Sequence, residues 1–323
     1  MQDSLAKYHY HLLSRDEKAF YEKIQKQLTL GRKKITIRYT PSIHKILKAL
    51  REDSAELYFV NWQAVFTHIQ FKARERLITW EVSYLYEREV IKRIEARIQR
   101  ILQTFSALKS ESAIALAVHD WLANNVTYDQ IEVTQDAFKF RNHNAVGALI
   151  SQKAVCEGFA RAYQLLLNRL GVDCMMVCGK AEADGSWENG LHAWNIVCIN
   201  GKNYYVDVTW DAASYVGDKK HATYSYYCLS KRMISVDHEC RLPIVCNSRK
   251  ENLFYKTNRV FSSEKDLFAF FKGRKKEKKG AFVMIDGIRE ERVEECLTKW
   301  CDVLHKSCQY IQYKMNVWYI KFF

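Results

Sequence analysis

Short runs of apolar residues with helical or strand-like spacing follow one another along the whole chain. Residues three and four apart share a face of a helix, whereas residues two apart share a face of a strand, so the spacing predicts the element. Before residue 110 the predicted elements are a helix from Ser14 to Leu28, a strand from Lys34 to Tyr39, a helix from Pro41 to Leu50, strands in Glu56 to Val60 and Val65 to Tyr86, and a long helix from Glu87 to Phe105.

The same alternation returns after residue 240. The predicted elements are a strand from Leu253 to Phe261, a helix from Glu264 to Phe271, a strand from Ala281 to Ile285, a helix from Glu290 to His305 and a strand from Tyr310 to Phe322. Because both flanks alternate helices with strands, the element order favours two copies of one small α+β unit, although no residue-level repeat accompanies it.

The segment from Ala154 to Gly171 has a helical period. Gly171 stands where a helix commonly ends, and one stripe of the helix is apolar: Phe159, Ala162, Tyr163, Leu166 and Leu170. Cys156 therefore lies in the first turn, where unpaired backbone N–H groups and the positive end of the helix dipole favour a thiolate. Glu157 partly opposes that effect. Taken alone, Cys156 is better explained as a small buried apolar residue, as most free cysteines are.

Two strand-like runs further along are joined by Asn200-Gly201, the strongest short-range indication of a β-hairpin. The runs extend from Leu191 to Ile199 and from Lys202 to Thr209. A two-residue turn places Ile199 opposite Lys202, and the register of the whole hairpin follows from this pair.

The register predicts that His192 and Asp207 project from one face. His192 would face Thr209 and Trp194 would face Asp207, so the imidazole and the carboxylate become diagonal neighbours, roughly 7–8 Å apart. The carboxylate could then accept a hydrogen bond from one ring nitrogen and leave the other free for the thiol of Cys156. Each residue alone is more simply explained as structural. Together they favour a catalytic cluster.

Three motifs in this region resemble the core of the transglutaminase-like superfamily. They are Lys153 to Ala160 (KAVCEGFA), His192 to Asn195 (HAWN) and Tyr205 to Asp211 (YVDVTWD). The resemblance is closest to the bacterial branch, whose fold is related to the papain-type cysteine proteases. His119 to Leu122, followed by Tyr128-Asp129, is similar to a helix that precedes the core in that branch.

The resemblance implies that Cys156 is the nucleophile, His192 the base and Asp207 the acid that orients the base. It implies an α+β, papain/transglutaminase-like core in which the cysteine helix packs on an antiparallel sheet. It also implies attack on an amide carbonyl, a thioester intermediate, and transfer to an amine or to water. The backbone N–H of Cys156 is a candidate oxyanion donor, and the second donor is unassigned.

The chain of 323 residues exceeds the usual size of one domain. We expect an N-terminal α+β region with a linking helix (residues 1–109), the catalytic core (110–240) and a basic C-terminal α+β domain (241–323). The two flanking domains are small.

Composition predicts a protein without cofactor or metal. The ten cysteines show no CxxC pair and no metal-like Cys/His spacing, so they suit free thiols in a reducing compartment. No EF-hand loop or acidic cluster suggests calcium. No apolar run approaches the roughly 20 residues of a membrane span, and the first residues lack the apolar region of a secretory signal. The sequence predicts a cytoplasmic location.

The net charge of +13 raises the question of a nucleic-acid partner. The basic residues are scattered apart from a run at Lys272 to Lys279, which is best explained as a solvated loop. Since no recognition motif accompanies the charge, we expect no specific nucleic-acid partner. A protein or peptide substrate is expected, and an acidic or anionic partner stays open.

Three functional classes compete. The first is a thiol enzyme that acts on protein or peptide amides, either cross-linking glutamines to amines or hydrolysing the amide as a cysteine peptidase or amidase. The second is a catalytically inactive interaction module of the same fold, and the third is a charge-driven binding protein. The presence of all three catalytic residue types favours the enzyme.

Overall fold

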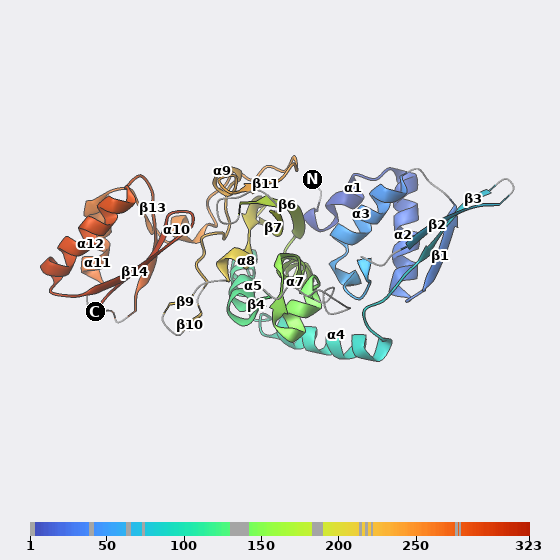
Figure 1. The fold of residues 1–323 in the computed structure, drawn as a ribbon, viewed down its shortest axis with the longest axis horizontal. Helices are drawn as coiled ribbons and strands as arrows, with labels where there is room; N and C mark the ends of the chain where they lie inside the picture. Colours follow the sequence, from blue (N-terminus) through green and yellow to red (C-terminus); the bar gives the residue numbers. More distant parts are fainter. Residues whose placement is uncertain are drawn as a thin grey trace.

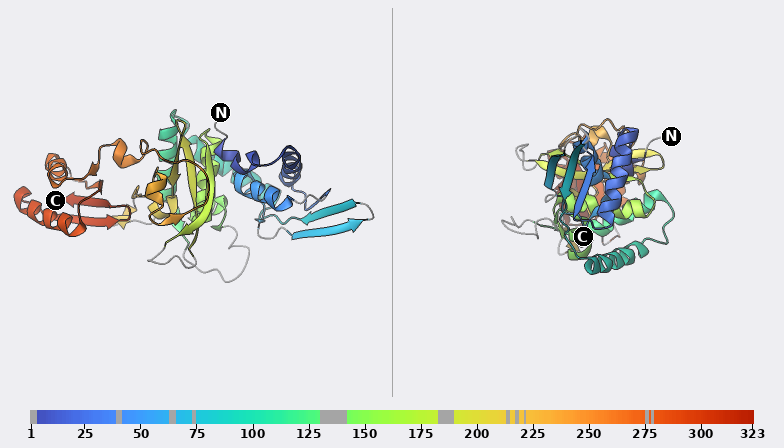
Figure 2. Two further views of the ribbon diagram at one scale, coloured as in Figure 1. Left: turned by 90° about the horizontal axis from the view of Figure 1, so that it is seen from above. Right: turned by 90° about the vertical axis from the view of Figure 1, so that its right-hand side faces the viewer.

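The computed structural model describes residues 4–38, 42–62, 66–72, 75–129, 142–182, 190–212, 215–216, 219–220, 222–274, 277 and 279–323. Pro41 and part of the Lys272 to Lys279 run lie outside the described residues. The molecule is elongated, with a central domain between an N-terminal and a C-terminal unit at opposite ends (Figure 1). The view from above shows the same order along the long axis (Figure 2).

The central domain is built on a four-stranded antiparallel sheet in the order β11-β6-β7-β8. The strands are β6 (Cys174–Ala181), β7 (Leu191–Ile199), β8 (Lys202–Val206) and β11 (His238–Glu239). Helix α7 (Cys156–Arg169) packs on β6 and β7, and α5 (Glu111–Asn125) packs against α7. The predicted α+β class, with the cysteine helix on an antiparallel sheet, is confirmed.

Apolar side chains on both sides of this sheet hold the domain together. On the α7 side, Phe159, Tyr163 and Leu166 share one cluster with Val197 and Val206. The opposite side carries a second cluster, which includes Met175, Val177, Trp194, Ile196 and Tyr205. Burial of both faces explains why β7 is nearly continuously apolar after His192. The hairpin that carries the candidate residues is therefore a rigid central element.

The N-terminal unit has its own apolar core. Its elements are η1 (Leu5–Lys7), α1 (Tyr8–His11), α2 (Arg15–Thr29), β1 (Lys34–Arg38), α3 (Ile43–Asp53), η2 (Ala55–Leu57), β2 (Phe66–Lys72) and β3 (Glu75–Glu81). Ser14 and Glu17 form a capping box at the start of α2. The predicted strand from Glu56 to Val60 is wrong. This segment begins with a 3-10 turn, and Val60 makes only an isolated bridge to Tyr84.

The C-terminal unit also has a separate core. Its elements are α10 (Leu253–Lys256), β12 (Val260–Phe261), α11 (Glu264–Gly273), β13 (Ala281–Ile285), α12 (Glu290–Leu304), β14 (Cys308–Tyr313) and β15 (Val317–Phe322). Two strand predictions are corrected. Asn252 caps a short helix where the strand was expected to begin. The final strand is a hairpin, because Met315 and Asn316 adopt left-handed conformations that turn the chain.

The two flanking units have the same order of elements and the same pairing of three strands. The series α2-β1-α3-β2-β3 corresponds to α11-β13-α12-β14-β15. In each, the first strand pairs antiparallel with the third, and the third pairs antiparallel with the second. The C-terminal sheet adds β12, which pairs parallel with β13. The strand pairing thus agrees with the two similar units that the element order favoured.

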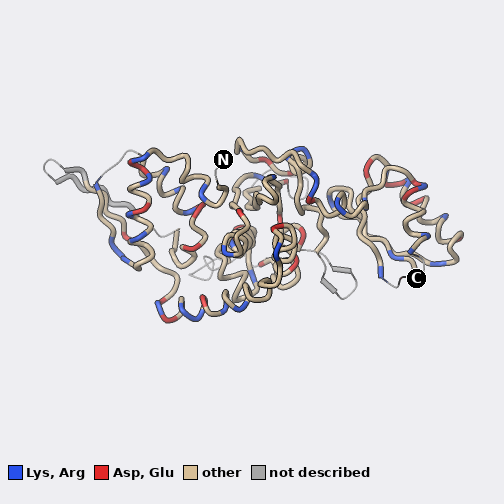
Figure 3. Tube along the Cα trace, turned by 180° about the vertical axis from the view of Figure 1, so that it is seen from behind, with Lys and Arg blue, Asp and Glu red and all other residues tan. Residues whose placement is uncertain are grey.

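Short elements and one long helix connect these parts. They are α4 (Arg88–Gln103), β4 (Thr127–Tyr128), a π-helical turn (Gly147–Ser151), β5 (Lys153–Ala154), α8 (Val208–Asp211), β9 (Tyr215–Val216), β10 (Lys219–Lys220) and α9 (Lys231–Ile234). No described helix combines the length and apolar character that crossing a membrane requires. Lys and Arg recur along the whole trace, interspersed with Asp and Glu (Figure 3).

Candidate active site

Cys156 is the first residue of α7. The preceding residue, Val155, is extended and provides no side-chain cap, so the N–H groups of the first turn have no side-chain acceptor from the N-cap. The half-buried Cys156 packs against Ala160, Met176 and Ala193. Cys156 therefore lies in the first turn of the helix, as the sequence predicted.

Gly158, two residues into the helix, has no room for a side chain. A Cβ atom at this position would lie 2.3 Å from the backbone oxygen of Asn142 and 3.2 Å from that of Asn144. The glycine in the CEGFA motif is thus explained by close approach of two backbone segments, which fixes the start of α7 against the preceding chain.

Glu157 is neutralised by basic neighbours. Its carboxylate accepts hydrogen bonds from Nη2 of Arg161 at 2.8 Å and from Nε at 3.0 Å, and lies 3.1 Å from Nδ1 of His143. Burial alone would raise the pKa of this carboxyl, but His143 and Arg161 outweigh it and lower the pKa to about 2. The negative charge that would oppose a thiolate at Cys156 is therefore largely compensated.

The hairpin has the predicted register, with Ile199 opposite Lys202 and Asn195 opposite Val206. The predicted second strand is three residues too long, because β8 ends at Val206. Asp207 instead caps the short helix α8, and its carboxylate lies 2.6 Å from Nε2 of His192. The expected imidazole–carboxylate contact is present, and the helix cap that follows the strand orients the carboxylate.

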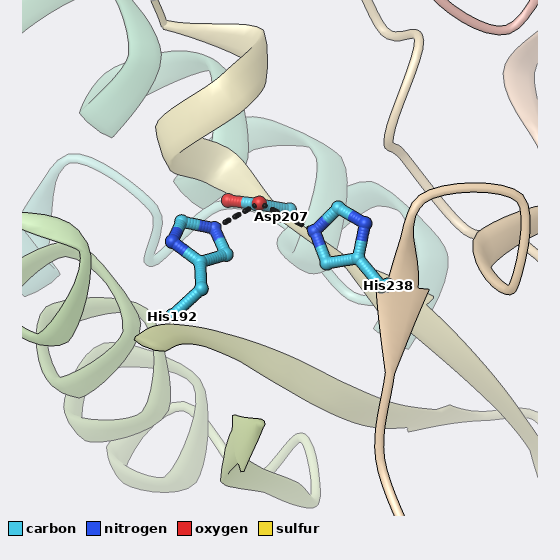
Figure 4. A group of neighbouring side chains, drawn as sticks. All are labelled: His192, Asp207 and His238. Carbon is cyan, nitrogen blue, oxygen red and sulfur yellow. Dashed lines mark hydrogen bonds and ion pairs between the residues drawn. The ribbon is translucent and has the colours of Figure 1, made fainter. Parts of the chain in front are cut away.

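The carboxylate of Asp207 is fully buried and has four donors. Oδ1 accepts from the backbone N–H of Thr209 at 2.9 Å and of Trp210 at 3.3 Å. Oδ2 faces Nε2 of His192 at 2.6 Å and Nε2 of His238 at 3.2 Å (Figure 4). Burial would raise the pKa of this carboxyl, but His192 and His238 outweigh it and lower the pKa well below its usual range. Asp207 is an anion between two imidazoles.

His192 connects this anion to the thiol. Its Nε2 bonds Asp207, and its ring also interacts with the Cys156 thiol. Burial would lower its pKa, yet the Asp207 carboxylate and the Cys156 contact raise it to about 10. The ring stacks on Trp194 at a centroid distance of 5.9 Å and lies 5.4 Å from Trp210. The two tryptophans restrict the imidazole to the orientation in which it bridges thiol and carboxylate.

Other motif residues have supporting roles. The side-chain amide of Asn195 donates to the backbone oxygens of Ala160 at 2.9 Å and Met175 at 3.2 Å, which ties α7 to the sheet. Asp211 accepts from Thr223 at 2.7 Å and lies 2.9 Å from Nε2 of His119. These contacts give His119 and Asp211 a buried structural role that braces α5 against α8.

Sequence reasoning missed two residues beside the cluster. His238, on β11, is buried and shares Oδ2 of Asp207 with His192. Tyr128, on β4, lies close enough that burial and the charges of Cys156 and Asp207 raise the pKa of its phenol. His238 has no helical or strand period to mark it, and Tyr128 was only part of a motif. Only the fold brings them to the cluster.

Ligand atoms of His192, Asp207 and His238 lie within 4.8 Å of one another, a spacing that a metal ion could use. Their facing atoms are already hydrogen-bonded to each other, so each would have to give up a bond to become a ligand. The donor set is better explained as a hydrogen-bonded chain than as a metal centre.

Comparison with known proteins places one segment of the chain in a family. Residues 99–209 match the model of the Transglutaminase-like superfamily. This segment is a transglutaminase-like domain. It contains Cys156, His192 and Asp207, the three residues that the motif resemblance singled out.

Part of the chain also matches curated proteins. Kyphoscoliosis peptidase of Homo sapiens is 31% identical over 104 residues, and that of Mus musculus is 30% identical over 105 residues. Each match covers 29% of this chain and 15% of the relative's length. A solved structure described as a TGase has 18% identity and a TM-score of 0.34, and covers 58% of this chain and 52% of its own.

Proposed function

We propose that the protein is a thiol enzyme that attacks amide carbonyls of protein or peptide substrates through Cys156. The observation that carries the proposal is the bridging imidazole of His192, which contacts Cys156 and lies 2.6 Å from Asp207. Covalent acyl transfer requires a nucleophile, a base and a group that orients the base.

The chemistry follows from these positions. The Cys156 sulfur, as a thiolate, attacks the carbonyl carbon, and the backbone N–H of Cys156 donates to the developing oxyanion. His192 gives its proton to the leaving amine as the C–N bond breaks, which leaves a thioester on Cys156. Water or a second amine then attacks the thioester, His192 takes the proton that this acceptor loses, and the C–S bond breaks to return Cys156 to a thiolate. Asp207 keeps the imidazole oriented throughout.

Hydrolysis is one of the two outcomes, and the curated relatives favour it because they are described as peptidases. Transfer to an amine is the other, and it is the reaction by which proteins are cross-linked. Both share the Cys156 thioester, so they differ only in the acceptor.

Selective alkylation of Cys156 is the first expected result. With iodoacetamide near neutral pH, we expect Cys156 to react at least about tenfold faster than Cys178. Cys178 is the matched control because it is the more exposed of the two thiols and lies on the neighbouring strand β6. Mass spectrometry of tryptic peptides measures both rates in one sample.

Two variants complete this test. His192→Ala should slow labelling of Cys156 and leave that of Cys178 unchanged, and Cys156→Ala identifies the labelled peptide. Labelling of Cys156 that is no faster than that of Cys178, in folded protein, would contradict a catalytic thiol and would favour the inactive interaction module.

The products identify the acceptor. After incubation of a cell lysate with the protein, we expect new chain ends if water accepts the acyl group, or new isopeptide bonds if an amine does. Cys156→Ala is the control, and peptide mass spectrometry detects both products. A lysate in which neither product depends on Cys156 would contradict both enzymatic outcomes.

A further inference from the structure

His238 is held between two carboxylates. Its Nε2 lies 3.2 Å from Oδ2 of Asp207, and its Nδ1 lies 2.6 Å from Oδ1 of Asp237. The imidazole is fully buried, and Asp237 in turn accepts from the hydroxyl of Tyr226 at 2.5 Å. The chain of contacts therefore extends from His192 through Asp207 and His238 to a second acid.

The hydrogen-bond inventory determines the protons on this ring. An ionised carboxylate only accepts, so a nitrogen that faces one must carry hydrogen. Asp207 has donors at both oxygens, including two backbone N–H groups, and Asp237 has Tyr226 at its other oxygen. With both carboxylates ionised, both nitrogens of His238 donate, which makes the ring an imidazolium.

We infer that His238 is a buried imidazolium that acts as a positioning residue for the proposed reaction, anchoring Asp207 and offsetting part of its negative charge at His192. The inference rests on the proposed function for its role, whereas the charge of His238 rests on its contacts with two ionised carboxylates. Sequence reasoning assigned no role to this residue.

Among the described residues, the groups that contact the nitrogens of His238 are two carboxylates. Asp207 comes from the end of β8, Asp237 precedes His238 on its own segment, and Tyr226 contacts the ring at a centroid distance of 5.5 Å. His192 on β7 lies 5.5 Å away. Nζ of Lys314 lies 4.5 Å from the indole ring of Trp210 and donates to the backbone oxygen of Glu182 at 3.3 Å. Within the part of the chain that the structure describes, the two carboxylates thus lie closer to the ring than His192 or Lys314 does.

The positive charge of His238 has a consequence for catalysis. Asp207 alone would hold the proton on His192 strongly, whereas a positive charge on the far side of the carboxylate weakens that hold. His192 must release its proton to the leaving amine in the proposed reaction. A cationic His238 therefore makes His192 a better proton donor while it keeps the carboxylate in place.

The substitution Asp237→Asn tests the charge of His238 without changing the shape of its surroundings. The substituted amide can donate to Nδ1 of His238, so the ring needs only one proton and can still donate Nε2–H to Asp207. His238 becomes neutral with its contacts kept. We expect the apparent pKa of His192 to rise by about one pH unit, measured by nuclear magnetic resonance of its ring nitrogens.

The same spectra report His238 directly. In the wild-type protein at neutral pH, both ring nitrogens of His238 should be protonated, and in Asp237→Asn only one should be. Asp120→Asn is the matched control, because Asp120 lies 3.2 Å from Nδ1 of the buried His119, another imidazole between two carboxylates. It should leave the titration of His192 unchanged.

Two results would overturn the inference: a single proton on His238 in the wild-type protein, or a titration of His192 that Asp237→Asn does not move. If Asp237→Asn does not fold, His238→Gln places a neutral donor beside Asp207. The apparent pKa of His192 should then rise by the same amount. These measurements need no turnover. A doubly protonated His238 in a protein whose Cys156 is not selectively alkylated would refute the proposed function and leave the charge assignment standing.

Discussion

Asp207→Asn is expected to slow alkylation of Cys156 at neutral pH by about a hundredfold. The carboxylate has donors at all four positions, so an amide of the same shape must turn its NH2 group toward either the two imidazoles or the two backbone N–H groups. In both orientations donors face donors, and His192 loses the acceptor that orients it. Mass spectrometry of the iodoacetamide-labelled peptide measures the rate.

The control for this change is Asp173→Asn. Asp173 also accepts backbone N–H groups, from Leu5 and Ala6 at 2.7 and 2.8 Å, but does not contact an imidazole of the cluster. In Asp173→Asn, Cys156 should be alkylated at the wild-type rate. An Asp207→Asn protein with a native circular dichroism spectrum and an unchanged labelling rate would show that the carboxylate does not orient the base.

Alkaline pH is expected to destabilise the protein through buried histidines. His119 lies between Asp120 and Asp211, and these carboxylates overcome the effect of burial and raise its pKa from 6.5 to about 9. A group whose pKa is higher in the folded state stabilises fully below its unfolded pKa, and that stabilisation is lost as pH rises through the folded value. The free energy of unfolding should therefore fall by about 3 kcal/mol for this group between pH 6.5 and about 9.

Urea denaturation at a series of pH values measures this loss. His9, between Glu52 and Asp53, has its pKa raised to about 9 and adds to the same slope. In His119→Gln the free energy of unfolding should be lower near neutral pH and should depend less on pH. A stability that increases from neutral to alkaline pH, or an unaltered slope in His119→Gln, would contradict a buried cationic His119.

The parts of the site that depend on local sequence were predictable. The Asn200-Gly201 turn fixed the register of β7 and β8, and the apolar stripe of α7 placed Cys156 at a helix start. Both are set by residues close together in the chain. The contact between His192 and Asp207 then followed from counting along two strands, although Asp207 proved to be a helix cap beyond the strand.

Contacts set by tertiary packing were not predictable. β11 is two residues long, and no periodic pattern can appear in so short a segment. His238 reaches Asp207 only because β11 pairs with β6 at the sheet edge. The error at Leu253 to Phe261 has a local cause instead, because the Asn252 cap turns an apolar run into a helical turn. Apolar runs alone do not distinguish these outcomes.

Gly179 of β6 allows close packing near the edge of the central sheet because it has no side chain. At Gly179 of β6, a Cβ atom would lie 2.2 Å from the backbone oxygen of Glu239 and 2.6 Å from Cη2 of Trp194. Even a methyl group there would push away the residue that follows His238 and the indole that stacks on His192. The contacts of His192 and His238 with one oxygen of Asp207 thus depend on a glycine at position 179. Gly179 should therefore tolerate substitution less than the other positions of β6.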